Sequence, residues 1–287
     1  MEIFEVSPQG FCGGVINAIR IAEDTARKYP DTKITILGSL VHNSFVNRQL
    51  EELGLSVVEA RDRTRLELLD EVDDGIVIFT AHGISDAVRK KAAEKGLQTI
   101  DASCRFVLST QKIIQEKQEQ GYAIFYIGKK GHPEAEGAIT PDQNNYLIET
   151  AADIPDHVQG PVFVTNQTTM SVLDLQDLFD EIRRRYPDAE FCSEICTATR
   201  LRQQAVYDLK DRQIDLLIVI GDPKSNNTRK LSATGRKAGI PRVLQVESAK
   251  EINPEDLDGV NRVAVTSGAS TPEFLKREVL DFLHAHQ

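Results

Sequence analysis

The sequence lacks any apolar run long enough to cross a membrane. Its longest apolar stretch, LLIVIG at 216–221, has the length of a buried strand, whereas a membrane-spanning helix needs about 20 apolar residues. The first residues, MEIFEVSPQG, also lack the basic start and the long apolar stretch of a signal peptide. These absences exclude the membrane as a partner and predict a cytoplasmic protein.

The sequence is also poor in basic clusters and in cysteine. Its 34 lysine and arginine residues are scattered among 44 aspartate and glutamate residues, and the formal net charge of −10 argues against nucleic acid as the main partner. Only 4 of the 287 residues are cysteines. In a cytoplasmic chain such cysteines are more often free, catalytic or metal-bound than paired in disulfides.

Three of the four cysteines mark an internal repeat. Cys12, Cys104 and Cys196 are evenly spaced, and each precedes a helical pattern that leads into a short apolar strand. Cys104 lies between an expected strand at 97–100 and an expected helix that begins at 105. A helix N-terminus favours the thiolate form and so a nucleophile or metal ligand, although an isolated cysteine is more often a small buried hydrophobe.

The repeat extends to the ends of the strands. The fourth residues after the strand-end glycines at 38, 128 and 221 are His42, His132 and Ser225. A second strand in each unit also ends in a polar loop. The helices that follow these loops have expected N-caps at Ser85, Ser171 and Thr271, the last with Pro272 at the first helical position.

The repeat predicts an α/β fold of three similar units. We expect the first unit at 14–104, the second at 105–195, and the third at 196–287 together with an N-terminal strand at 1–13. No Gly- or Pro-rich linker separates them, so we expect tight packing. Ligand groups gather beyond the carboxyl ends of parallel strands, and a threefold arrangement would bring the three repeated cysteines together at a centre.

Three converging thiolates favour an iron-sulfur cluster over zinc. A structural zinc site needs four ligands, whereas three thiolates fit a four-iron cluster that leaves one iron open to substrate or water. Cys192 is a possible fourth ligand in CSEIC, but it has no counterpart in the other units, which favours a structural role.

The polar residues at the strand ends indicate the chemistry of the ligand. Together with helix N-terminal amides, five of them form a donor set suited to phosphate: His42, His82, Ser225, Asn227 and Ser270. His132 and Glu134 in GHPEAEG form a possible proton-delivering pair. Singly, His42 could be a turn residue, Glu134 a solvated charge and Ser225 a helix cap. Their recurrence at corresponding positions favours the joint interpretation.

The sequence resembles the LytB, or IspH, family of 4-hydroxy-3-methylbut-2-enyl diphosphate reductases over nearly its whole length. The matching motifs, in order and spacing, are GFCGGV, VHN, TAHGIS, GHPEAEG, TNQTTMS, EICTATRLRQ, GDPKSNNTRKL and TSGAS. The resemblance implies a trefoil of three α/β domains with pseudo-threefold symmetry around a central [4Fe-4S] cluster. It also implies reductive removal of an allylic hydroxyl, with two electrons and two protons, to give isopentenyl and dimethylallyl diphosphate.

The resemblance further implies roles for individual residues and a partner. The implied cluster ligands are Cys12, Cys104 and Cys196. The implied diphosphate-binding residues are His42, His82, Ser225, Asn226, Asn227 and Ser270, with Asn226 where serine or glycine is often found. The implied group that handles the substrate hydroxyl and its proton is His132, Glu134 and Thr168. Ferredoxin or flavodoxin is the implied electron donor.

The sequence departs from the family pattern beside two cysteines. Arg105 replaces the proline that usually follows the second cysteine, and Gly13 stands where alanine or an aromatic residue is common. Arg105 either lies near the cluster, where it would make the reduction potential less negative, or contacts the substrate diphosphate, or reaches solvent. Two alternatives therefore stay open: a paralogue acting on another substrate, and a non-catalytic iron-sulfur sensor. Retention of Glu134 and its neighbours speaks against the sensor.

Overall fold

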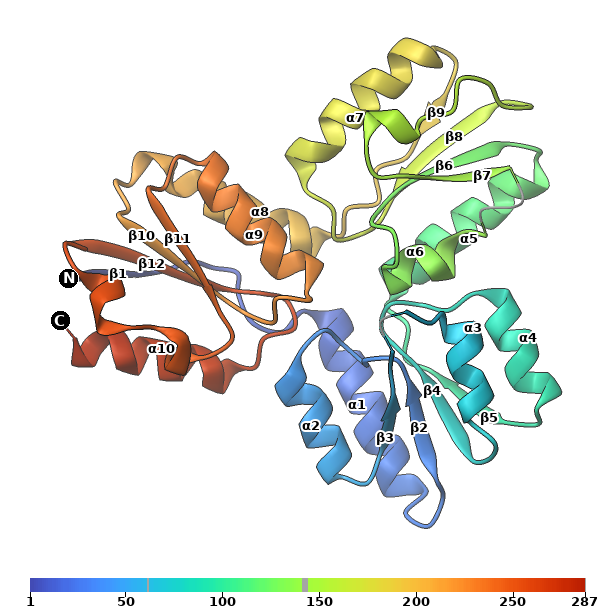
Figure 1. Cartoon of the computed structure of the whole chain (residues 1–287), viewed down its shortest axis with the longest axis horizontal. Coiled ribbons are helices and arrows are strands. Elements are labelled where there is room, and N and C mark those ends of the chain that lie inside the picture. The colour runs from blue at the N-terminus through green and yellow to red at the C-terminus, as the bar shows by residue number, and fades with distance from the viewer. Residues whose placement is uncertain (61, 141–143, 287) are drawn as a thin grey trace. The chain divides into compact units, whose positions relative to one another are not determined.

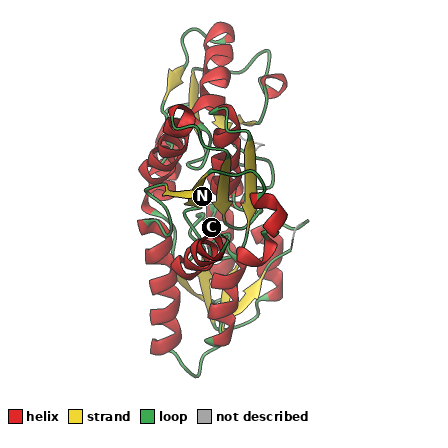
Figure 2. Ribbon diagram, turned by 90° about the vertical axis from the view of Figure 1, so that its left-hand side faces the viewer, coloured by secondary structure: helices red, strands yellow, loops and turns green. Residues whose placement is uncertain are grey.

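Strands alternate with helices throughout the chain, which confirms the predicted α/β class (Figures 1 and 2). The computed structural model describes residues 1–60, 62–140 and 144–286. Among these residues, the strands form three four-stranded sheets, and every strand pairing is parallel. None of the helices in the described ranges combines the length and apolar character that spanning a membrane requires.

The chain divides into two compact units. The terminal unit comprises Met1–Val15, His42–Val46 and Cys196–Gln287, and the central unit comprises Ile16–Val41 and Asn47–Ile195. One sheet belongs to the terminal unit and two belong to the central unit. The predicted boundaries of three separate units stay a prediction.

The sheet of the terminal unit has helices on both faces (Figure 1). Its strands, in spatial order, are β1 (Glu2–Glu5), β12 (Arg262–Ser267), β10 (Leu216–Ile220) and β11 (Arg242–Val246). Its helices are α8 (Thr197–Tyr207), α9 (Asn226–Lys237) and α10 (Glu273–Ala285). Alternate residues of β10 point to opposite faces, so Ile218 packs with Val279 of α10 while Leu217 packs with Leu231 of α9.

The first sheet of the central unit contains β3 (Ser56–Val58), β2 (Ile34–Leu37), β4 (Ile76–Phe79) and β5 (Gln98–Asp101). The helices near it in the chain are α1 (Gly13–Lys28), α2 (Ser44–Glu52), α3 (Arg65–Leu68) and α4 (Asp86–Glu94). Buried Val77 and Phe79 pack with Leu68 of α3 and Val88 of α4, so these two helices cover one face.

The second sheet of the central unit contains β7 (Asn145–Ile148), β6 (Ala123–Ile127), β8 (Val162–Asn166) and β9 (Glu190–Phe191). Helix α7 (Val172–Arg185) covers one face, and α5 (Arg105–Glu119) and α6 (Pro133–Ala138) cover the other (Figure 1). The alternation within β6 explains this, because Phe125 packs with Phe179 of α7 whereas Tyr126 packs with Ala135 of α6.

The predicted ends of the elements are largely confirmed. The glycines at 38, 128 and 221 directly follow β2, β6 and β10, and Ser85 and Ser171 are the N-caps of α4 and α7. The N-cap prediction for Thr271 is wrong, because α10 begins at Glu273 and its N-cap is Pro272. The hydroxyl of Thr271 instead donates to the carbonyl of Ile220, which ties this loop to the end of β10.

Candidate functional site

The three repeated cysteines occupy the same local setting. Each directly precedes a helix: Cys12 lies before α1, Cys104 is the N-cap of α5 and Cys196 is the N-cap of α8. All three are partly exposed, and none of them is in a disulfide. The amides of Cys12 and Cys104 donate at 3.0 Å to the carbonyls of Ala269 and Ala81, which lie in corresponding loops after β12 and β4. Cys12 and Cys196 belong to the terminal unit, and Cys104 belongs to the central unit.

Glu134 is the one acidic side chain among the predicted site residues, and it is buried. It lies on the first turn of α6 and is 2% exposed. Its Oε1 accepts the amide of Thr168 at 2.7 Å, and its Oε2 accepts the hydroxyl of Thr168 at 3.0 Å. Burial raises the pKa of Glu134 from 4.5 to about 7, and the hydrogen bonds from Thr168 and Tyr126 offset only part of that rise. The carboxyl group is therefore able to hold a proton near neutral pH.

Two histidines accompany Glu134 in the central unit. Nδ1 of His132, the N-cap of α6, accepts the amide of Glu134 at 3.1 Å, so its ring hydrogen lies on Nε2. The rings of His132 and His82 pack edge to face, with centroids 5.8 Å apart. Cys104 is tied to the same place, because its amide bonds the carbonyl of the residue before His82. The central unit thus gathers His82, His132, Glu134, Thr168 and Cys104.

A buried arginine that the sequence analysis missed orients His82. Arg65 is 5% exposed, and its Nη2 donates to Oγ1 of Thr80 at 3.2 Å. The same oxygen lies 3.3 Å from Nδ1 of His82. Because Thr80 accepts from the guanidinium, its hydroxyl hydrogen is available to Nδ1, which favours the tautomer of His82 with its hydrogen on Nε2.

Arg65 is held by a carboxylate from the GHPEAEG motif. Glu136 accepts the amide of Arg65 at 2.6 Å, and its second oxygen lies 3.8 Å from Nη1. Burial lowers the pKa of Arg65 to about 10, while Glu136 acts in the opposite direction. The pair joins α3 to α6, and so couples the orientation of His82 to the helix that carries Glu134.

The terminal unit gathers most of the predicted diphosphate-binding residues. Ser225 is the N-cap of the twelve-residue helix α9, and Asn226 and Asn227 form its first turn. Oδ1 of Asn227 accepts the amide of Ala269 at 3.0 Å, and the hydroxyl of Ser270 donates to the backbone carbonyl of His42 at 2.9 Å. The backbone amides and the helix dipole at a helix N-terminus favour an anion.

The same unit links these residues to a cysteine and a second missed arginine. Nδ2 of Asn227 donates to Thr199 at 3.4 Å, and the hydroxyl of Thr199 lies 3.2 Å from Sγ of Cys196. Arg202 is buried one turn farther along α8. The signal for Arg202 is its helical spacing from buried Thr199 and Val206, which places it on the inward face of α8.

The fourth cysteine and Arg105 have ordinary settings. The thiol of Cys192 donates to Glu194 at 3.0 Å, and burial, followed by this bond, raises its pKa to about 11. Such a thiol resists forming the thiolate that metal ligation needs, which favours the structural interpretation. Arg105 is exposed, and its guanidinium lies over the ring of Phe106 at 5.0 Å, which favours the solvent interpretation of that residue.

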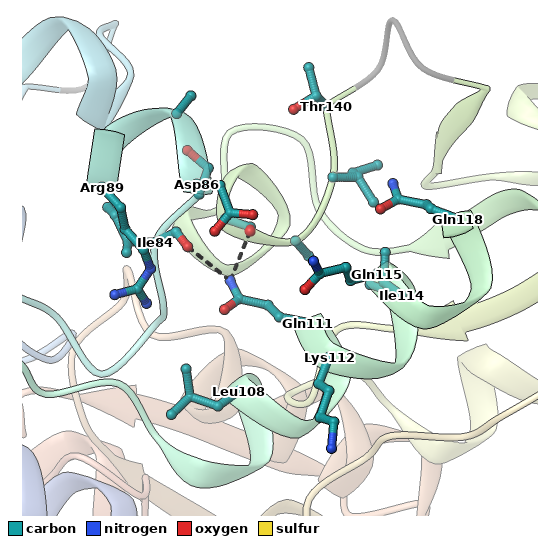
Figure 3. Close-up of a pocket in the computed structure, with 15 residues that line it drawn as sticks. Ile84, Asp86, Arg89, Leu108, Gln111, Lys112, Ile114, Gln115, Gln118 and Thr140 are labelled. Carbon is teal, nitrogen blue, oxygen red and sulfur yellow. Dashed lines mark hydrogen bonds between the residues drawn. The ribbon is translucent and has the colours of Figure 1, made fainter. Parts of the chain in front are cut away.

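A separate cavity of about 540 Å³ lies in the central unit at the start of α4, along α5 and at the end of α6 (Figure 3). Gln111 lines this cavity, and its side-chain amide donates to the carbonyls of Ile84 and Gly137 at 3.3 and 2.8 Å. None of the predicted site residues lines this cavity.

Comparison with protein families and sequences gives a consistent result. The family described as LytB protein matches residues 3–284. The 4-hydroxy-3-methylbut-2-enyl diphosphate reductase of Bacillus cytotoxicus is 46% identical over 291 residues, which cover 100% of this chain and 91% of the relative. The enzyme of the same name from Bacillus licheniformis is 44% identical over 288 residues, covering 99% and 90%.

Solved structures agree with the sequence comparisons. The structure of the E-1-hydroxy-2-methyl-but-2-enyl-4-diphosphate reductase from Plasmodium falciparum has a TM-score of 0.88 and 30% identity, covering 99% of this chain and 87% of that one. A structure of (E)-4-hydroxy-3-methyl-but-2-enyl diphosphate reductase, described as the terminal enzyme of the non-mevalonate pathway, has a TM-score of 0.67 and 28% identity, covering 99% and 100%.

Proposed function

The chain belongs to the LytB protein family, and from that premise we propose that it is a 4-hydroxy-3-methylbut-2-enyl diphosphate reductase. It replaces the allylic hydroxyl of its substrate with hydrogen, using two electrons and two protons and releasing water. The products are isopentenyl and dimethylallyl diphosphate. The observation that carries the proposal is buried Glu134, whose carboxyl group, with a pKa of about 7, is held by Thr168 beside His132.

The proposed cofactor is a [4Fe-4S] cluster held by Cys12, Cys104 and Cys196. No group of three or more histidine, cysteine, aspartate or glutamate side chains in the described ranges is arranged to hold a metal ion. Support comes from the donor chemistry: three partly exposed cysteines outside disulfides, each at the start of a helix, where the dipole favours thiolates. When bound, such a cluster supplies two electrons in single steps and an open iron that polarises the hydroxyl oxygen.

Glu134 is the proposed proton donor to the leaving hydroxyl. A carboxyl group with a pKa of about 7 is protonated in a large fraction of molecules at neutral pH and still gives up its proton readily. Thr168 contacts both carboxylate oxygens and so fixes the direction of the group. His132 stays in one tautomer because its Nδ1 accepts the amide of Glu134. A sensor without turnover would need none of this arrangement.

The proposed diphosphate site contains His42, His82, Ser225, Asn226, Asn227 and Ser270. In the terminal unit the support is the first turn of α9, where Ser225, Asn226 and Asn227 are only 4–5% exposed and already positioned by hydrogen bonds. In the central unit the support is the contact of Nδ1 of His82 with Thr80, which favours the tautomer with a donor at Nε2. Donors that are fixed in advance bind an anion at a lower cost in conformational entropy.

The proposed electron donor is ferredoxin or flavodoxin. The cation of Arg105 is exposed one residue after Cys104, and Leu108, on the next turn, is 39% exposed. A positive charge beside an apolar side chain is complementary to a small acidic electron-transfer protein. Arg105→Glu is expected to slow reduction by such a donor, more so at low salt, and to leave reduction by a small dye unchanged. Equal slowing with dye and protein would contradict this docking role.

The deciding experiment is an anaerobic assay of the purified, reconstituted protein. The protein is supplied with 4-hydroxy-3-methylbut-2-enyl diphosphate and a reduced viologen dye, and the products are separated by chromatography. We expect dye oxidation coupled to the two isoprenoid diphosphates, two dye electrons for each substrate consumed. A protein that holds a full cluster but leaves this substrate unchanged would contradict the proposal and favour a paralogue.

A further inference from the structure

A buried cation in the terminal unit has no part in the chemistry described so far. Arg202 is 4% exposed on α8, six residues after Cys196. Its Nη1 donates to the carbonyl of Ala198 at 2.9 Å, and its Nη2 donates to the carbonyl of Gly10 at 2.7 Å. These two bonds hold the guanidinium between the first turn of α8 and the loop that carries Cys12.

One of the three guanidinium nitrogens makes no hydrogen bond to the described residues. Nε of Arg202 is buried and has no hydrogen-bond partner among the described residues. A buried donor of a charged group is costly when unpaired, so its retention indicates an acceptor from outside the described residues. Burial lowers the pKa of Arg202, and the charges of Cys12 and Cys196, two proposed cluster ligands, act in the opposite direction.

We infer that Arg202 is a positioning residue for the iron-sulfur cluster, and that its Nε–H donates to a sulfur atom there. The inference rests on the proposed function, because it requires a cluster at Cys12 and Cys196. A hydrogen bond to sulfur and a fixed nearby cation both stabilise the more negative, reduced state. Arg202 therefore makes the cluster easier to reduce.

The alternative is a purely structural Arg202, which joins α8 to the loop at Gly10 and does nothing to the cluster. Both roles predict that Arg202→Met lowers the stability of the protein, because the carbonyl of Gly10 loses its donor. They differ in the reduction potential, which a purely structural residue would leave unchanged.

The test compares Arg202→Met and Arg202→Lys with wild type and with Arg200→Met. Arg200 is exposed on the same helix, so its replacement removes the same charge without touching the buried contacts. Iron and sulfide are measured in anaerobically reconstituted protein, and the cluster is titrated with redox dyes. For Arg202→Met we expect a roughly tenfold lower ratio of reduced to oxidised cluster at a fixed potential, which is about 59 mV for one electron. The reduction potential of Arg202→Lys should lie between those of Arg202→Met and wild type, and that of Arg200→Met should equal the wild-type value.

An unchanged potential in a fully loaded Arg202→Met variant would overturn the inference. If that variant does not fold, Arg202→Lys decides, since it keeps the charge but has no Nε–H, and a wild-type potential would then contradict the hydrogen bond. Equal shifts in Arg200→Met and Arg202→Met would also overturn it, because only net charge would matter. Failure of the wild type to hold a cluster would instead refute the proposed function.

Discussion

Replacing Glu134 with glutamine separates proton transfer from substrate binding. Glutamine has the same shape, and its carbonyl oxygen can accept the Thr168 amide that now lies 2.7 Å from Oε1. The hydroxyl of Thr168 can turn to accept from the new amide group. Binding is therefore expected to persist while turnover falls by roughly 10² to 10⁴, the usual effect of removing a positioned acid.

The same substitution has a calculable effect on stability. The pKa of Glu134 is about 7 in the folded protein and 4.5 as its ordinary value. Since the folded value is the higher one, its stabilising contribution is fully present below pH 4.5 and is lost as the pH rises through 7. At 1.36 kcal/mol per pKa unit, the loss between these limits is roughly 3 kcal/mol, and glutamine does not suffer it.

Urea unfolding of the cluster-free protein at about pH 5 and about pH 8 measures this difference. Between these two pH values, we expect the free energy of unfolding to fall by roughly 2–3 kcal/mol more in the wild type than in Glu134→Gln. Glu116→Gln is a matched control, because Glu116 is 54% exposed on α5 and its loss should leave the pH dependence unchanged. In the activity assay, the turnover rate of the wild type should decrease as the pH rises through about 7, because Glu134 then loses its proton.

Two results would refute this reasoning. Turnover of Glu134→Gln within a few-fold of wild type would show that another group supplies the proton. An identical pH dependence of unfolding in wild type and variant would show that the carboxyl group is not held protonated by burial.

Three further predictions concern the cluster, the diphosphate site and the buried arginine. Cys192→Ser should keep full iron and sulfide content whereas Cys104→Ser loses most of it, and loss in Cys192→Ser alone would overturn the ligand assignment. Ser225→Ala should raise KM and cost roughly 0.5–2 kcal/mol in urea unfolding, because α9 loses its N-cap; an unchanged KM would remove Ser225 from the diphosphate site. Arg65→Met should cost roughly 1.5–3 kcal/mol and raise KM through His82, and a stability loss with unchanged KM would leave Arg65 a structural role alone.

The repeat made the fold and the candidate site predictable. In each repeat, a glycine ends a strand and a polar residue follows it at the same interval. This pattern predicts that the polar residues lie at corresponding positions beyond the strand ends. Parallel sheets place those ends where ligands bind. The structure accordingly puts His132 and Ser225 at the N-caps of α6 and α9, directly beyond β6 and β10. Cys104 likewise occupies the N-cap position of α5, shortly after the end of β5 at Asp101.

The two buried arginines could not be predicted in the same way. An arginine is normally expected to be exposed to solvent, since burying a cation is costly unless partners surround it. Their partners come from distant segments: Glu136 is 71 residues from Arg65, and Gly10 is 192 residues from Arg202. Only the folded chain shows which cations are enclosed. Thr271 is not an N-cap because α10 begins only at Glu273, and its hydroxyl donates instead to the carbonyl of Ile220, 51 residues away.

The enclosed cations and the strand-end residues share one physical property, which is that the fold orients them before any ligand arrives. Thr168 fixes Glu134, Thr80 fixes His82, and the amide of Ala269 fixes Asn227. The side chains that make these bonds lose their conformational entropy on folding rather than on ligand binding. The donors and the acid are therefore already oriented when the ligand binds. The unloaded protein is less stable as a result, because Glu134 is buried and the Nε of Arg202 is buried without a partner among the described residues. Ligand and cluster binding should therefore stabilise the fold as well as complete the site.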